Sequence, residues 1–170
     1  MILKILECML CSPNMVDRTI GIITFYDQQR ILIRHLIRER LYALNFFKFR
    51  NFITNLPLSF PSDYTRTDVR LVQDLQGTEM DVVIISCVKT KVRDRDRNLA
   101  MLTDHWNVAL TRAIESLFIV GNLKTLQTNE VLKDFVIDAD KRQVIYRVSS
   151  KFQRSMLYDI LLKPVDYVQL

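Results

Sequence analysis

The sequence predicts an α/β fold built around a mostly parallel β-sheet. Residues 20–25, 82–88 and 117–122 are short apolar runs, typical of strands that are covered on both faces. Segments with helical spacing of apolar residues separate these runs, and strands that alternate with helices favour a parallel sheet. The chain has 170 residues, of which 49% are apolar and 25% charged, so it fits about one folded domain and is not a disordered chain.

The first half of the chain predicts a helix, a strand and a second helix. Apolar residues recur at three- and four-residue steps over residues 2–10, which indicates a short helix. A longer helix, from residue 27 to about 44, follows the 20–25 strand. Its expected inward residues are Ile31, Ile33, Leu36, Ile37, Leu41 and Leu44, and its expected outward residues are Arg30, Arg34, Arg38, Glu39 and Arg40. Residues 50–66 hold prolines, serines and asparagines and are expected to form a loop.

The second half continues the alternation. The expected elements are, in chain order, a weak strand at 68–72, a polar turn at 73–81, the strongest strand at 82–88, a charged loop at 89–98, a helix at 105–116 and the strand at 117–122. Beyond residue 122, a helix that carries Leu123, Leu126, Val131, Leu132, Phe135 and Val136 is expected to pack on the sheet. Residues 151–170 form a second amphipathic segment, interrupted by Pro164.

Glycine is scarce, which excludes one class of nucleotide site. The chain contains only Gly21, Gly77 and Gly121, where average usage of about 7% predicts about twelve. A phosphate-binding loop needs two or three closely spaced glycines, because its backbone must approach the phosphates. We therefore expect no phosphate loop in this chain.

Net charge, cysteine content and hydropathy further limit the kinds of partner, metal site and cellular compartment that the chain is expected to have. A net charge of +5 is compatible with a polyanionic partner without requiring one. Three cysteines, an odd number, argue against a secreted disulfide framework and favour an intracellular protein, cytoplasmic or nuclear. Cys8 and Cys11 have C-x-x-C spacing, but neither His35 nor His105 completes a zinc site, so no metal is expected on this chain. No apolar run approaches the ~18 residues of a membrane span, so no membrane partner is expected.

Three segments next to the strands resemble motifs IV, V and VI of superfamily 1 helicases of the Upf-like kind. They are Ile-Gly-Ile-Ile-Thr at 20–24 with Tyr26 and Gln29, Leu-Gln-Gly-Thr-Glu-Met-Asp-Val-Val-Ile-Ile-Ser at 75–86, and Asn-Val-Ala-Leu-Thr-Arg-Ala at 107–113. The resemblance covers about residues 1–135. It implies the second, C-terminal RecA-like domain, a three-layer α/β sandwich of the P-loop NTPase type that carries no phosphate loop, at residues 1–140 with a partly helical tail at 141–170.

The resemblance implies a role for the chain in ATP hydrolysis. In this architecture ATP lies between two RecA-like domains, and a cation from the second domain neutralises charge on the γ-phosphate. Arg112 takes this catalytic role, because its planar, always charged guanidinium suits phosphate. Glu79, Tyr26 and Gln29 take nucleotide-binding roles. Two simpler interpretations stay open: Arg112 as an exposed arginine paired with Glu115 or Asp104, and Tyr26 as a core aromatic whose hydroxyl finds a local partner. ATP and Mg²⁺ are expected only in the complete two-domain enzyme, with the missing first domain as partner, and not on this chain alone.

The resemblance also implies contact with single-stranded RNA or DNA. The expected nucleic-acid-binding residues are Gln76, Gly77, Thr24, Asn107 and Thr111. A Gln-Gly dipeptide by itself is more often only a turn. The chain departs from the family pattern at several positions. Leu71 stands where the family has a hydroxyl residue, Leu75 where it has a phenylalanine, Thr78 where it has an arginine, and Asp104 and His105 where it has a pair of arginines. These changes remove positive charge, which weakens the expectation of tight nucleic-acid binding.

Three hypotheses about function follow. The first is the C-terminal half of an ATP-dependent helicase that acts on RNA in the 5′-to-3′ direction and is inactive alone. The second is a non-catalytic helicase-like remnant that binds a protein partner, and the third is a basic RNA-binding module.

Residues 44–52 interleave aromatics with Lys48 and Arg50, which suits either a stacking platform for single strands or apolar packing.

Overall fold

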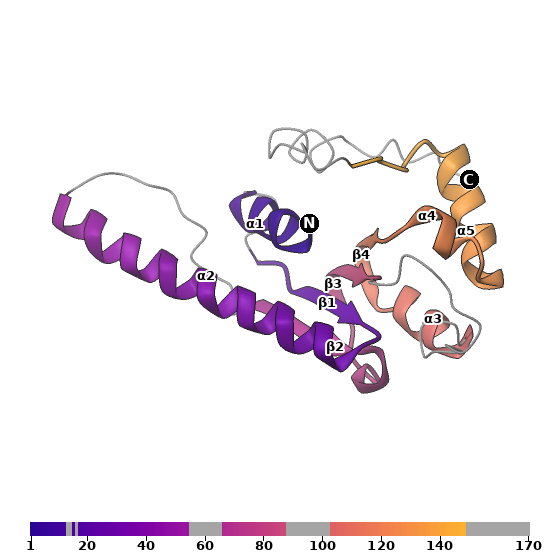
Figure 1. The fold of residues 1–170 in the computed structure, drawn as a ribbon, viewed down its shortest axis with the longest axis horizontal. Helices are drawn as coiled ribbons and strands as arrows, with labels where there is room; N and C mark the ends of the chain where they lie inside the picture. Colours follow the sequence, from indigo (N-terminus) through magenta and orange to yellow (C-terminus); the bar gives the residue numbers. More distant parts are fainter. Residues whose placement is uncertain (13–14, 16, 55–65, 88–102, 149–170) are drawn as a thin grey trace.

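A sheet of four parallel strands forms the centre of the fold (Figure 1). The computed structural model describes residues 1–12, 15, 17–54, 66–87 and 103–148. The strands are β1 (Ile20–Thr24), β2 (Thr67–Leu71), β3 (Met80–Ser86) and β4 (Ala113–Val120), in the spatial order β2-β1-β3-β4. All three neighbouring pairs are parallel, which confirms the expected class of sheet.

Helices cover both faces of the sheet and complete three layers. The helices are α1 (Ile2–Cys11), α2 (Asp27–Thr54), α3 (Thr103–Leu110), α4 (Leu123–Leu126) and α5 (Glu130–Lys141), with a 3₁₀ turn, η3, at Val72–Asp74. α1 and α2 pack on one face, where Leu6 and Ile33 belong to a buried cluster with Ile22. α3 and α5 pack on the other, where Trp106 and Leu132 join a second cluster. The RecA-like α/β architecture is thereby confirmed.

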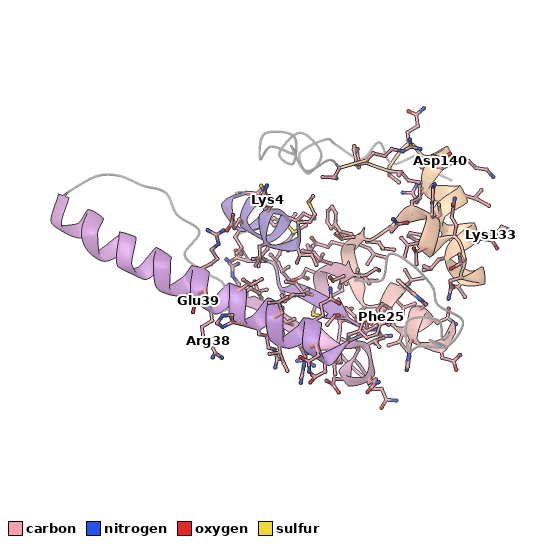
Figure 2. The ribbon with its side chains drawn as sticks, viewed as in Figure 1. Lys4, Phe25, Arg38, Glu39, Lys133 and Asp140 are labelled. Carbon is pink, nitrogen blue, oxygen red and sulfur yellow. The ribbon has the colours of Figure 1, made fainter. Side chains whose placement is uncertain are left out.

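Side chains alternate between the two faces of the sheet, so β1 and β3 contribute residues to both buried clusters. Ile22 and Ile84 face the α1–α2 cluster, whereas Ile23 and Ile85 face the α3–α5 cluster. All five residues of β1 are buried, because helices cover the strand on each side and strands flank it at both edges. Figure 2 shows Phe25 within the packed interior, in contact with Trp106, while Lys133 and Asp140 point outward from α5.

The connection from β2 to β3 is unusually short. Residues 72–79 carry the chain past β1, which lies between the two strands that they join. Leu75 in this connection is fully buried in the α3-side cluster. The side chain of Met80 lies over Gly21 so closely that a Cβ at Gly21 would meet the Met80 sulfur at 2.2 Å. Glycine at this position gives the Met80 side chain the room to lie over β1.

The second helix is longer than the sequence predicts, and its buried stripe is narrower over residues 27–40, where the structure describes the side chains. The expected helix end near residue 44 and the expected loop over residues 50–54 are wrong, because α2 continues to Thr54 and extends well beyond the sheet (Figure 1). Neither Gly nor Pro occurs between Asp27, where the helix begins, and Pro57. The expected inward positions Ile31 and Leu36 are exposed, whereas Ile33 and Ile37, one turn apart, face the core. The predicted inward residues Leu41 and Leu44 lie outside the part of the helix whose side chains are described.

The expected helix over residues 105–116 is wrong in its second half. α3 ends at Leu110, and β4 already begins at Ala113, which pairs with Met80. The single helix expected after residue 122 is divided into α4 and α5, because Asn129 provides a new N-cap by accepting a hydrogen bond from the Leu132 N–H. Phe135, expected in the core, is exposed.

Several expectations lie outside the described residues or stay predictions. The charged run at 89–98, the segment at 151–170 and the loop at 55–65 belong to the part that is not described. The division into a domain at 1–140 and a tail at 141–170 stays a prediction.

Thr19 and Asp81 join the start of β1 to the start of β3. The Asp81 carboxylate accepts hydrogen bonds from the Thr19 N–H at 2.8 Å and the Thr19 hydroxyl at 2.7 Å. The Asp81 N–H also lies 3.0 Å from the Thr19 hydroxyl oxygen. The bonds from the Thr19 backbone and side chain hold the pKa of Asp81 below its usual value of 3.8. Because the folded pKa is lowered, this contribution to stability is present above the unfolded pKa and is lost as the pH falls through the folded pKa.

We therefore expect Asp81→Asn to reduce the free energy of unfolding by about 1 kcal/mol at pH 7, since the neutral amide accepts weaker hydrogen bonds in a solvent-accessible place. The difference from wild type should shrink as the pH is lowered below about 4, where the wild-type carboxylate takes up its proton. Urea unfolding at pH 7, 5 and 3 measures both values. A difference that does not change with pH would contradict this account of Asp81.

Gly77 offers a separate test of backbone geometry. Its φ is +70°, and no atom lies within 4 Å of the position of an added Cβ. Gly77→Ala should therefore cost about 1 kcal/mol through backbone strain alone, and Gly77→Asn should cost less, because Asn tolerates the left-handed region. Thermal and urea unfolding of both variants measure the difference. Equal losses for Ala and Asn would show that the backbone conformation is not the cause.

Candidate functional site

Arg112 lies between α3 and β4 and is held by three acceptors. Its Nε donates to the Val108 carbonyl at 3.0 Å, its Nη2 to the Thr111 hydroxyl at 3.0 Å, and its Nη1 to the Thr78 carbonyl at 3.4 Å. Val108 belongs to the last turn of α3, where carbonyl groups lack helical partners, so the guanidinium caps the helix with a positive charge. A guanidinium carries five N–H donors, and these bonds leave two of them without an acceptor among the described residues.

Glu79 lies beside Arg112 at the start of β3. Its two chain neighbours both bond Arg112, Thr78 through its carbonyl oxygen and Met80 through its N–H, which donates to the Arg112 carbonyl at 3.0 Å. Glu79 itself is exposed. The structure therefore brings together Glu79 and Arg112, two of the residues that the sequence assigns to nucleotide chemistry.

The Gln76–Gly77 turn leads into this corner of the sheet. The Leu75 carbonyl accepts hydrogen bonds from the Thr78 N–H at 3.2 Å and the Thr78 hydroxyl at 3.0 Å, which closes a four-residue turn. The positive φ of Gly77 at the third position is the conformation that a type II turn requires. Gln76 and Gly77 are exposed at the tip. The turn is thus anchored on the buried Leu75 and linked through Thr78 to Arg112.

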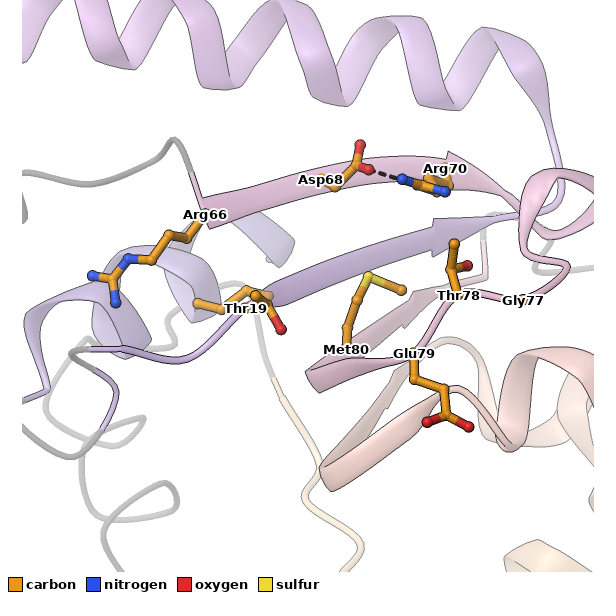
Figure 3. A pocket seen from close by; sticks show the side chains of 9 residues that line it. Thr19, Arg66, Asp68, Arg70, Gly77, Thr78, Glu79 and Met80 are labelled. Atoms are coloured by element: carbon orange, nitrogen blue, oxygen red, sulfur yellow. Dashed lines mark hydrogen bonds and ion pairs between the residues drawn. The ribbon is translucent and has the colours of Figure 1, made fainter.

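An open pocket of about 540 Å³ borders the same loop (Figure 3). Its charged lining comes from alternate residues of and before β2, Arg66, Asp68 and Arg70, and from Glu79. Asp68 and Arg70 pair with each other, and Figure 3 shows Glu79 directed away from this pair. The pocket therefore combines both signs of charge and offers no uniform field for a polyanion.

A second polar cluster lies at the opposite end of the strands. The Thr24 hydroxyl donates to the Gln29 side-chain oxygen, and the Gln29 amide donates to the Ser86 hydroxyl. Thr24 and Ser86 are register partners on adjacent strands and are 0% and 3% exposed. The network ties the first turn of α2 to the carboxyl ends of β1 and β3. Tyr26 is half-buried and packs against the α3-side core.

The structure separates residues that the sequence assigns to one nucleotide. Glu79 and Arg112 lie at the amino end of the sheet, whereas Tyr26 and Gln29 lie at its carboxyl end. The six residue steps from Met80 to Ser86 span about 20 Å, so the two sets cannot contact the same phosphate.

The residues assigned to nucleic acid are also divided. Gln76, Gly77, Asn107 and Thr111 are exposed, but Thr24 is fully buried, and its hydroxyl is used inside the protein. Among the positions that depart from the family pattern, Asp104 is exposed, Leu71 and His105 are half-buried, and the Thr78 hydroxyl is turned inward to Leu75.

Sequence reasoning did not identify Ser86. Its signal is a hydroxyl at the end of the apolar run in β3, level with Thr24 of the neighbouring strand.

Burial raises the pKa of the Cys87 thiol, next to Ser86, to about 12, so this thiol is not a reactive nucleophile. Within the described ranges, no group of three or more His, Cys, Asp or Glu side chains could hold a metal ion. Across that same part of the chain, every helix is too short or too polar to cross a membrane.

Known proteins share this sequence pattern. A family model described as an AAA domain matches residues 1–124. The "Probable helicase senataxin" of Mus musculus and that of Homo sapiens are 31% and 32% identical over 149 residues, which is 87% of this chain and 5% of each relative. The "Regulator of nonsense transcripts 1 homolog" of Neurospora crassa is 29% identical over 141 residues, which is 81% of this chain and 11% of that protein. The chain therefore belongs to the AAA domain family and is a domain of the Upf-like superfamily 1 helicase type.

Proposed function

We propose that this chain is the second RecA-like domain of an ATP-dependent helicase that acts on RNA in the 5′-to-3′ direction. In this proposal Arg112 is the arginine finger, which contacts the γ-phosphate of ATP bound to a first RecA-like domain. The observation that carries it is the Arg112 corner, where a guanidinium with two uncommitted N–H donors lies next to the exposed Glu79. The direction and the choice of RNA rest on the resemblance to the named helicases.

The residues at this corner fit part of a nucleotide. Two parallel N–H donors of a guanidinium match two phosphate oxygens, and an exposed carboxylate suits the hydroxyl groups of a ribose. ATP with Mg²⁺, bound when the two domains meet, supplies the phosphoryl group that is transferred to water. Arg112 would stabilise the charge that develops on that group, and Glu79 would orient the sugar. Tyr26 and Gln29 lie too far along the strands to take part at the phosphate.

The proposal assigns nucleic acid to the exposed Gln76–Gly77 turn and to Asn107 on α3. Gly77 carries no side chain and has open space around its Cβ position, so a phosphate can approach the backbone of the turn there. Alone, the chain should hydrolyse no ATP, since the phosphate loop and magnesium carboxylates of such enzymes belong to the first domain.

A second candidate function is a helicase-like remnant that binds a protein partner. The exposed Asp104 and the inward Thr78 hydroxyl favour it, because both sit where the family carries arginines. Cooperative folding together with binding of a protein partner, but of neither ATP nor RNA, would support this function over the first.

Arg112→Ala tests the proposed function. The chain is mixed with the first RecA-like domain of a Upf-like helicase, and the ATPase rate is measured with and without single-stranded RNA. Loss of the finger should lower kcat by about a thousandfold. Arg112→Lys should recover only part of the rate, because an ammonium cannot form the planar two-point contact.

Arg142→Ala is the matched control, since this exposed arginine pairs only with Asp138 on its own helix among the described residues. It should leave the rate unchanged. Arg112→Ala also removes the cap of α3, so the unfolding midpoint of each variant is measured alongside. A wild-type rate in a folded Arg112→Ala chain would rule out the assignment.

A further inference from the structure

The Thr111 hydroxyl contacts both the end of α3 and the guanidinium of Arg112, the proposed arginine finger. The hydroxyl lies 2.9 Å from the Asn107 carbonyl oxygen and 3.2 Å from that of Val108, which are two of the carbonyls in the last turn of α3. It also accepts a hydrogen bond from Nη2 of Arg112 at 3.0 Å. A hydroxyl has one proton and two lone pairs, so a proton committed to the helix leaves a lone pair aimed at the guanidinium.

We propose that Thr111 is a positioning residue for Arg112 and not a nucleic-acid ligand. The inference rests on the proposed role of Arg112. The three acceptors, Val108, Thr111 and Thr78, come from the helix, the junction and the loop before β3, and each meets a different nitrogen of the guanidinium. Together they fix the plane of the fork, which leaves two N–H groups in one defined orientation. Catalytic groups are effective when they are held in place before the reaction.

Of the three acceptors, only Thr111 offers a side chain that mutation can remove. The other two are backbone carbonyls. Val replaces Thr with nearly the same shape but without the hydroxyl, and Ser keeps the hydroxyl without the methyl group. The two variants therefore separate the hydrogen bond from the packing.

The first measurement is the ATPase activity of the chain combined with the first domain, as for Arg112. Thr111→Val should lower kcat by about tenfold, because a hydrogen bond to a charged group is lost, while the affinity for single-stranded RNA stays within twofold of wild type. Thr111→Ser should match wild type. Weakened RNA binding with an unchanged kcat would overturn the proposal and would support Thr111 as a nucleic-acid ligand.

The second measurement is a double-mutant cycle. If Thr111 acts through Arg112, adding Thr111→Val to Arg112→Ala should cause no further loss of kcat, whereas a merely structural role would add its own loss. An Arg112→Ala chain that keeps full activity would refute the proposed finger itself. An inactive Arg112→Ala chain beside a fully active Thr111→Val chain would refute only the positioning role.

The third measurement needs neither ATP nor a partner. In the full chain alone, the Nε–H resonance of Arg112 should be sharp and slow to exchange with water in wild type and in Thr111→Ser. It should exchange several-fold faster in Thr111→Val, or in Thr111→Ala if the valine variant does not fold. Fast exchange already in wild type would overturn the proposal, because the guanidinium would then not be held.

Discussion

The eight-residue connection between β2 and β3 is the constraint on which the site depends. Parallel strands are ordinarily joined by a crossover of a dozen or more residues that includes a helix. Here residues 72–79 must pass the intervening strand β1 and return to the amino end of the sheet. No helix longer than a single 3₁₀ turn fits, so the chain lies on the sheet itself. Gly21 provides the necessary space under Met80, and Gly77 provides the left-handed residue that reverses the chain.

Burial of Leu75 stabilises this connection by about as much as the two hydrogen bonds of its turn together. Leu75 is fully buried, which contributes about 2 kcal/mol, whereas each neutral hydrogen bond of the turn contributes about 1 kcal/mol. The anchored end brings Thr78 and Glu79 to the start of β3, where the Met80 N–H meets the carbonyl of Arg112. The positions of Glu79 and Arg112 relative to each other are therefore fixed by burial in the core and by the pairing of β3 with β4. The sheet in this way fixes the positions of residues that lie on an exposed loop.

The sequence predicted the strands well because their signal is local. Unbroken Ile and Val runs occur where a strand is covered on both faces, and β1 and β3 lie within two residues of their expected bounds. The end of α3 was not predictable in the same way, since Ala113 and Ile114 suit a helix as well as a strand. Pairing of Ala113 with Met80, more than thirty residues away, decides between the two. The motifs likewise identified the types of site residue, but only the register shows that Gln29 and Arg112 lie at opposite ends of the sheet.

The two ends differ in how far their polar groups are already satisfied. Thr24, Gln29 and Ser86 bond one another in a nearly buried network, whose role is to join α2 to the strands. Arg112 instead bonds a hydroxyl and two neutral carbonyl oxygens, and a phosphate oxygen is the stronger acceptor because it is charged. A phosphate that reaches this corner can therefore use the two remaining N–H groups without breaking the existing bonds. Only a ligand that also displaces Thr78 would disturb the Gln76–Gly77 turn, since the Thr78 hydroxyl and N–H close that turn on Leu75. Of the three residues that fix the arginine, Thr78 thus connects it to the exposed turn, and the carboxyl-end network has no such link among the described contacts.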